Sequence, residues 1–112
     1  MAKSRQELIE RALEELGVKA AGVTPSAEDV AVIESEIDPV MSDLGTREVY
    51  QWGDPDEFDN DAFIHLALIL ANSKARVFGG AYDDNLRMRC EARLRQLEPA
   101  ILSGQAQTTE YF

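Results

Sequence analysis

The chain has 112 residues, of which 45% are hydrophobic, so one domain with a single hydrophobic core is expected. Its net charge is −10, and an acidic surface repels phosphate backbones, which argues against sequence-specific nucleic-acid binding. A single cysteine, Cys90, excludes an internal disulfide framework and favours a reducing compartment. The first residues do not resemble a signal peptide, and the most hydrophobic run, residues 62–71, is too short to span a membrane. We therefore expect a soluble intracellular protein that does not contact membranes.

The charge is divided unevenly along the chain. Residues 1–65 contain sixteen Asp and Glu against five Lys and Arg, whereas residues 66–112 contain five against six. An acidic surface beside a nearly neutral one that carries arginines can pair with a second copy of the chain. Solubility alone explains the same distribution, and composition by itself favours that simpler interpretation.

The first predicted helix begins at residue 5 and ends at Gly17. Ser4 and Glu7 form a capping-box pattern, which satisfies backbone N–H groups at a helix start. Hydrophobic side chains then recur at helical spacing on one face. They are Leu8, Ile9, Ala12, Leu13 and Leu16. Gly17 follows the last of them, where helices commonly end in a left-handed residue.

The connector to the second helix offers two start signals, and the sequence leaves both open. Thr24 and Pro25 fit an N-cap followed by a first helical residue. Ser26 and Asp29 fit a second capping register two residues later.

The second predicted helix ends at Gly45 and has one hydrophobic face. The members of this face are Val30, Ile33, Ile37, Val40, Met41 and Leu44. Pro39 lies inside the helix, and its missing N–H leaves the carbonyl of Ser35 without a helical partner. We therefore expect a kink near Pro39.

In residues 46–58 the hydrophobic side chains do not recur at helical spacing. Val49, Tyr50 and Trp52 predict a short extended segment, which a Gly-Asp-Pro turn follows. The third helix is expected to begin after Asp59 as N-cap and to end at Gly79. It is hydrophobic on nearly every side, which predicts burial on every side, either in the core of the chain or between its own helices and a neighbouring subunit.

Further sequence patterns concern the start of the third helix and the bounds of the fourth helix. Phe58 and Phe63 have the spacing of a hydrophobic staple. Asp83 or Asp84 is expected to cap the fourth helix, and the dipeptide at 98–99, Glu-Pro, to end or kink it. A narrow hydrophobic stripe on this helix consists of Leu86, Cys90, Leu94 and Leu97.

These elements predict an all-α fold. We expect a four-helix bundle-like domain in residues 1–102, with a short extended excursion between its second and third helices. A flexible C-terminal tail is expected in residues 103–112, because SGQAQTTEYF has too few hydrophobic residues for a core of its own.

Candidate catalytic and metal-binding residues are few. His65 and Cys90 each lie among hydrophobic residues, so we expect a core histidine and an inert thiol. The acidic run 54–61 fails the calcium-loop pattern, because Phe58 and Asp59 stand where an oxygen ligand and a glycine are required. With no phosphate-binding loop or nucleophile motif, we expect a non-enzymatic protein without a cofactor or metal.

Arginines are dense only on the fourth helix. Arg87, Arg89, Arg93 and Arg95 spread around it, which argues against a phosphate-binding track. Arg93 falls on the hydrophobic stripe, so its side chain should either extend outward or pair with an acid.

Two runs of the sequence resemble the head-to-tail adaptor (connector) proteins of tailed bacteriophages. ALEELGVKAAGVTPSAEDVAVIESEIDPVMSDLG is similar to the opening of these proteins, in which a Leu-Gly-Val stop and an Ala-Gly-x-x-Pro-Ser connector lead into a long second helix. DNDAFIHLALILANSKARVFG, followed by RLRQLEPA, is similar to their hydrophobic third helix and their Arg/Leu-rich fourth. The likeness covers about residues 8–98. It lies in the order and general character of the segments and not in an invariant motif. Pro39 departs from the smooth second helix expected of the family.

The resemblance implies a structural protein of the virion neck, assembled in the host cytoplasm. Its subunits would form a dodecameric ring beneath the portal protein, extend the DNA channel and join the capsid to the tail or to further neck proteins. The implied partners are the portal, other copies of the chain and tail or neck proteins, with passive contact to DNA. The acidic excess suits a channel wall that lets DNA slide, and unlike surfaces suit ring contacts.

We expect the partner contacts to involve the tail and two arginines of the fourth helix. The residues are Thr108, Thr109, Tyr111, Phe112, Arg87 and Arg89. Tyr and Phe fill pockets on partners, and arginines pair with acids. The alternative is a small acidic helical protein that binds and regulates another protein.

Overall fold

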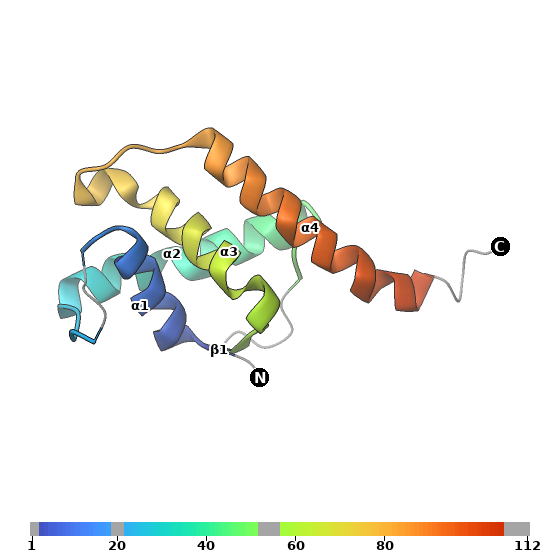
Figure 1. The fold of residues 1–112 in the computed structure, drawn as a ribbon, viewed down its shortest axis with the longest axis horizontal. Coiled ribbons are helices and arrows are strands. Elements are labelled where there is room, and N and C mark those ends of the chain that lie inside the picture. The colour runs from blue at the N-terminus through green and yellow to red at the C-terminus, as the bar shows by residue number, and fades with distance from the viewer. Residues whose placement is uncertain (1–2, 19–21, 52–56, 107–112) are drawn as a thin grey trace.

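The computed structural model describes residues 3–18, 22–51 and 57–106, with side chains as far as residue 97. Four α-helices dominate this part of the chain, which confirms the predicted all-α, bundle-like fold (Figure 1). The helices are α1 (Arg5–Glu15), α2 (Ala27–Thr46), α3 (Asn60–Ser73) and α4 (Asp84–Ala106). Two short strands, β1 (Lys3–Ser4) and β2 (Glu57–Phe58), and a 3₁₀ turn, η1 (Ala75–Phe78), complete the described elements.

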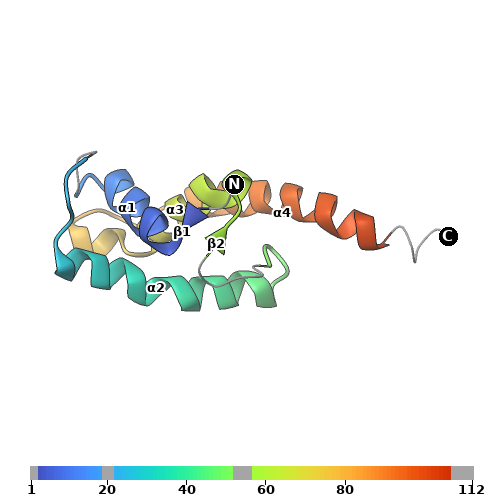
Figure 2. The same ribbon diagram turned by 90° about the horizontal axis from the view of Figure 1, so that it is seen from below.

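The helices form two layers. Helices α1, α3 and α4 lie in one layer with α3 in the middle, and α2 runs beneath that layer (Figures 1 and 2). Helix α3 contacts each of the other three helices. This arrangement leaves the side of α3 that faces away from α2 without a covering helix.

Helix α1 begins and ends as its sequence predicts. The side chain of Ser4 accepts a hydrogen bond from the backbone N–H of Glu7, and the Glu7 side chain accepts one from the Ser4 N–H. At the other end, Gly17 has a φ of +75°, and the N–H groups of Gly17 and Val18 bond back to the carbonyls of Glu14 and Leu13. This paired pattern closes the helix with glycine in the left-handed region.

Helix α2 begins at the later of the two predicted starts. Ser26 is the N-cap, and its side chain accepts a hydrogen bond from the N–H of Asp29. The earlier start at Thr24 and Pro25 is therefore wrong, because the first helical residue is Ala27. Helix α2 continues through Pro39 as one element and ends at Thr46, one residue beyond the predicted stop (Figure 2).

The segment after α2 differs from its prediction. Val49 and Tyr50 are buried, but they belong to no strand, and Trp52 lies outside the described residues. The strand in this region is β2, which pairs antiparallel with β1. The pairing joins residues far apart in sequence, so no local pattern predicts it.

Helix α3 follows Asp59 as predicted but ends earlier. The Asp59 carboxylate makes no capping bond; it accepts a hydrogen bond from the Tyr50 hydroxyl, with an O–O distance of 3.1 Å. The α-helix ends at Ser73, where the sequence predicted continuation to Gly79. The tighter turn η1 takes over and closes at Gly79, whose φ is +89°.

Hydrogen bonds of Asp83 and Asn72 hold the start of helix α4 in place. The Asp83 side chain accepts hydrogen bonds from the N–H groups of Asn85 and Leu86, which makes Asp83 the predicted cap. The buried Asn72 of α3 holds this helix start, because its side chain donates to the Asp83 carbonyl and accepts from the Asp83 N–H. The helix then continues to Ala106, so the predicted end at 98–99 is wrong, and the first residues of the predicted tail are helical.

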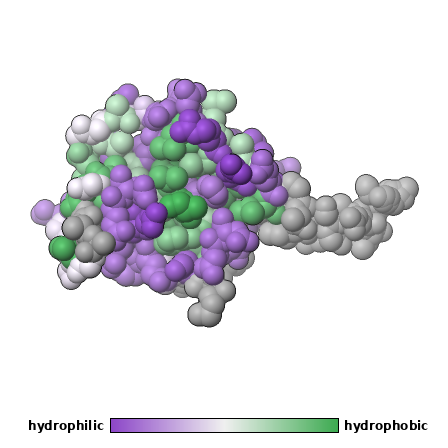
Figure 3. All heavy atoms as spheres, in the orientation of Figure 1, coloured by the Kyte–Doolittle hydropathy of each residue, from purple (hydrophilic) through white to green (hydrophobic). Residues whose placement is uncertain are grey.

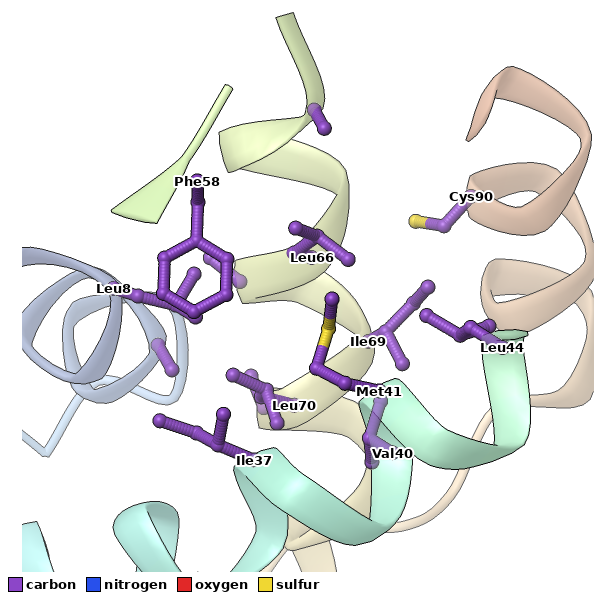
Figure 4. Packing of buried hydrophobic residues seen from close by; sticks show 14 of the residues in the cluster. Leu8, Ile37, Val40, Met41, Leu44, Phe58, Leu66, Ile69, Leu70 and Cys90 are labelled. Atoms are coloured by element: carbon purple, nitrogen blue, oxygen red, sulfur yellow. The ribbon is translucent and has the colours of Figure 1, made fainter. Parts of the chain in front are cut away.

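The hydrophobic core lies between the two layers. Figure 4 shows Phe58 of β2 beside Leu8 of α1, while Cys90 of α4 points inward on the opposite side of the cluster, where Ile69 and Leu44 lie. The predicted hydrophobic faces of α1 and α2 both contribute to this core. On α4, Cys90 is buried with Leu94, as the stripe predicted.

Candidate functional site

One side of α3 is incompletely covered. Ile64, His65 and Leu68 share a face by helical spacing, and all three side chains are only partly buried. The sequence predicted burial on every side of this helix, by the chain alone or together with a neighbour. In a single chain the burial is incomplete, because α2 packs against the opposite side of α3. Figure 3 shows a hydrophobic strip over the middle of the molecule, where α3 lies in Figure 1, with hydrophilic residues on both sides.

Two adjoining hollows follow this open face. The first has a volume of about 330 Å³ and is lined by His65, Leu68, Leu86, Arg89, Cys90 and Arg93. The second has a volume of about 250 Å³ and is lined by Glu15, Leu16, Leu68, Ala71, Asn72, Ala75, Ala81, Asp83 and Leu86. Leu68 and Leu86 line both, so the two hollows adjoin each other. We call them together the α3–α4 groove.

The groove has a positively charged end. Arg89 and Arg93 are exposed residues of α4 and line the first hollow next to His65. Burial lowers the pKa of His65, and the charge of Arg93 lowers it further, so the imidazole is neutral at neutral pH. The sequence predicted a core histidine, and the structure places it at the rim of the core, facing this hollow. Arg93 extends outward, one of the two outcomes expected for it.

The thiol of Cys90, which lines the groove, is poorly suited to act as a nucleophile. Cys90 is 3% exposed, and burial raises the pKa of its thiol despite the nearby positive charges of Arg89 and Arg87. A thiol with a raised pKa is a weak nucleophile at neutral pH. The first hollow therefore offers a hydrophobic surface, two guanidinium groups and a neutral imidazole, whereas the second hollow is bordered by the acids Glu15 and Asp83. The first hollow suits binding of a hydrophobic segment that carries an acid.

Arg87, the other arginine expected to contact a partner, has a different environment. Its guanidinium pairs with Asp43 at 3.0 Å and with Glu91 at 2.6 Å. Arg47, at the end of α2, pairs with the same two acids, each at 2.7 Å. We call these four residues the α2–α4 ion cluster. They join the end of α2 to α4, so Arg87 is engaged within its own chain. Arg89 forms no ion pair with the residues that the structure describes, and it borders the groove.

Sequence reasoning missed the groove and the ion cluster. The groove depends on the packing of α1, α3 and α4, and only the position of Arg93 on the hydrophobic stripe pointed to a charged residue beside exposed hydrophobic surface. The cluster pairs residues forty-four positions apart, which no local pattern shows. Thr108, Thr109, Tyr111 and Phe112 lie outside the described residues.

The described part of the chain has neither a cluster of metal ligands nor a membrane-spanning helix. No group of three or more His, Cys, Asp or Glu side chains there is arranged to hold a metal ion. In the acidic run 54–61, residues 54–56 lie outside the described part, and Asp59 bonds to Tyr50. None of the helices, as far as the chain is described, combines the length and hydrophobicity needed to cross a membrane.

Comparison with known proteins identified no relative: no family model, no curated protein and no solved structure matches this chain.

Proposed function

We propose that this chain is a structural subunit of the neck of a tailed bacteriophage. In this role it forms a dodecameric ring beneath the portal protein, extends the DNA channel and joins the capsid to the tail. The proposal rests on the sequence resemblance to head-to-tail adaptors and on three physical features of the chain. It describes a binding and scaffolding role, without catalysis or a cofactor.

The α3–α4 groove is the observation that carries the proposal. A cyclic ring needs a heterologous interface, in which one surface of a subunit contacts a different surface of the next. The groove is hydrophobic and is bordered at one end by Arg89 and Arg93, while residues 1–65 contain sixteen Asp and Glu against five Lys and Arg. Unlike surfaces on one subunit are what a heterologous interface requires.

Charge and core packing support the same role. A net charge of −10 suits a channel wall, because a negative surface does not bind the phosphate backbone and lets DNA slide. The core is complete in one chain, with large side chains from all four helices buried. Such a subunit can fold alone and assemble afterwards on the portal.

The alternative remains a small acidic protein that binds and regulates another protein. The groove is compatible with this second function, because an amphipathic helix of a partner protein can bind an open hydrophobic groove. The two functions differ in stoichiometry: a regulator binds one or two copies of a target, whereas a connector covers the whole face of a portal ring.

Electron microscopy of the portal protein from the same genome, mixed with this protein, tests the proposal. We expect an added ring of density on one end of the portal particle. Leu68→Glu, which places a charge in the groove, should abolish the added ring. Met88→Glu is the matched control, because Met88 is 65% exposed on α4 and does not line the groove. Portal particles without added density in the wild-type mixture would refute the proposal.

A further inference from the structure

The two hollows of the α3–α4 groove have sizes that suit aromatic side chains. Leu68 and Leu86 line both hollows, which have volumes of about 330 and 250 Å³. A bound aromatic ring would bury a large hydrophobic area there and would remove Leu68 from water. The occupant that fits best is therefore a segment with aromatic residues at its end.

The charged rim adds a second requirement. Arg89 and Arg93 border the first hollow, and among the described residues neither forms an ion pair. Their partner should carry a carboxylate next to its aromatic residues. Charge-assisted hydrogen bonds from guanidinium to carboxylate would then fix the direction in which the segment lies.

The C-terminal segment of this chain has this chemistry. Residues 107–112 read QTTEYF, in which Glu110 directly precedes Tyr111 and Phe112. Glu110 is the one acidic residue after Glu98. The segment thus places a single carboxylate beside two aromatic side chains, in a polar sequence that forms no core of its own.

The length of α4 prevents a chain from filling its own groove. Leu86 and Ala106 lie on the same helix, about 30 Å apart at the helical rise per residue. Fully extended, residues 107–112 span only about 20 Å. Figure 1 shows α4 running past the other helices, away from the groove. Arg93, at the near end of the groove, lies only about 20 Å from Ala106, but Leu86 and the second hollow of the same chain lie beyond the span of the segment. Tyr111 and Phe112 can therefore occupy both hollows only in a second copy.

We propose that the α3–α4 groove binds residues 107–112 of a second copy of this chain. Tyr111 and Phe112 occupy the hollows around Leu68 and Leu86, and Glu110 pairs with Arg89 and Arg93. Each copy then offers one segment and one groove, which is a head-to-tail interface that can close a ring. The inference rests on the proposed function for the supply of neighbouring copies, and it names the contact that joins them.

Peptide binding measures the contact directly. A fluorescent peptide of residues 103–112, SGQAQTTEYF, is titrated with the full-length protein and followed by anisotropy. We expect saturable binding that is lost when Tyr111 and Phe112 of the peptide are both replaced by alanine. Protein carrying Arg89→Glu and Arg93→Glu should bind roughly tenfold or more weakly, since two charge pairs become repulsive. Arg95→Glu, on the same helix but outside the groove, should change affinity less than about twofold. Absence of saturable binding, or equal loss in the control, would overturn the proposal.

Photo-crosslinking identifies the occupied site and the chain that supplies the segment. Full-length protein with p-benzoylphenylalanine in place of Phe112 is prepared with and without heavy isotopes, mixed, irradiated and mapped by mass spectrometry. We expect crosslinks between light and heavy chains at residues 64–68 and 86–93. Crosslinks within one chain, or to another surface, would contradict the proposal.

The two proposals fail separately. If rings form on the portal but the crosslinks map elsewhere, the connector function stands and the groove has another occupant. If the segment binds the groove but no ring appears on the portal, the contact stands and the connector function is wrong.

Discussion

The α2–α4 ion cluster shows how single residues hold this fold. Glu91 is 8% exposed and accepts hydrogen bonds from both Arg47 and Arg87. Hydrogen bonds from Arg47 are the largest influence that lowers the pKa of Glu91, and they act against the effect of burial. The same arginine lowers the pKa of Asp43 and has its own pKa raised. The charges therefore stabilise one another where α2 ends.

Removing the charge of Glu91 should destabilise the protein. Glu91→Gln keeps the shape of the side chain but leaves two guanidinium groups with weaker acceptors, at a cost of about 1–3 kcal/mol in the free energy of unfolding. Asp38→Asn is the control: this carboxylate pairs with Arg5, but its side chain is 72% exposed. Its loss should cost less than about 1 kcal/mol. Chemical denaturation at neutral pH compares the two, and equal effects would show that the cluster contributes no more than a surface pair.

Acid should weaken the same cluster. Because the pKa values of Glu91 and Asp43 are lowered in the folded protein, their contribution to stability is complete above pH 4.5 and is lost as pH falls through the lowered pKa values. The double variant Asp43→Asn, Glu91→Gln lacks this contribution. We expect the stability difference between wild type and double variant to shrink below pH 4.5, measured by denaturation at several pH values. A difference that stays constant down to the acid transition would contradict this account.

At the scale of elements, local signals were predictable and distant pairings were not. Ser4, Gly17 and Asp83 each act through neighbours within five residues, so the sequence shows the helix ends that they make. The pairing of β1 with β2 depends on residues brought together only by the folded chain. The groove was hidden for the same reason, since the period of α3 indicates a hydrophobic helix but not which side its neighbours leave open.

Pro39 is an unfavourable residue for the interior of a helix, yet it lies inside α2. The kink expected at Pro39 stays a prediction. The helix continues through Pro39, because hydrophobic residues on both sides of it, such as Ile37 and Met41, are buried in the core. Tertiary packing thus outweighs an unfavourable local residue.

Replacing this proline should stabilise the protein. Pro39 is exposed, so Pro39→Ala removes no core contact, restores a helical hydrogen bond and favours α2 by about 3 kcal/mol. A more flexible unfolded chain offsets about 1 kcal/mol of this gain. We expect a higher free energy of unfolding, by about 2 kcal/mol, in denaturant titrations. Ser42→Ala, at another exposed position of α2, is the control and should change stability by less than about 0.5 kcal/mol. A destabilised Pro39→Ala protein would show that the proline is required by the fold.

At the scale of the molecule, the helices form a layer of α1, α3 and α4 with α2 on one side of it (Figure 2). The core lies between α2 and this layer, and the α3–α4 groove lies at the surface. A net charge of −10 on each chain opposes the close approach of two copies.

The purified protein should therefore remain small without its partner. We expect mostly species much smaller than a ring in analytical ultracentrifugation at micromolar concentration and physiological salt, since charge repulsion opposes spontaneous ring closure. A stable ring as the dominant species under these conditions would contradict the expectation.

Duplex DNA should not bind to the purified protein. The acidic surface predicts no retardation of DNA in a gel at physiological salt, with a basic DNA-binding protein as positive control. Saturable binding that weakens steeply as salt increases would argue against a channel wall that lets DNA slide.

Native mass spectrometry shows whether this chain builds a complete ring on a portal. The portal protein from the same genome is incubated with an excess of this protein, and the mass of the complex is compared with that of the portal alone. The connector account predicts a single added mass that corresponds to a dodecamer of this chain. An unchanged portal mass, or the addition of only one or two copies, would contradict it.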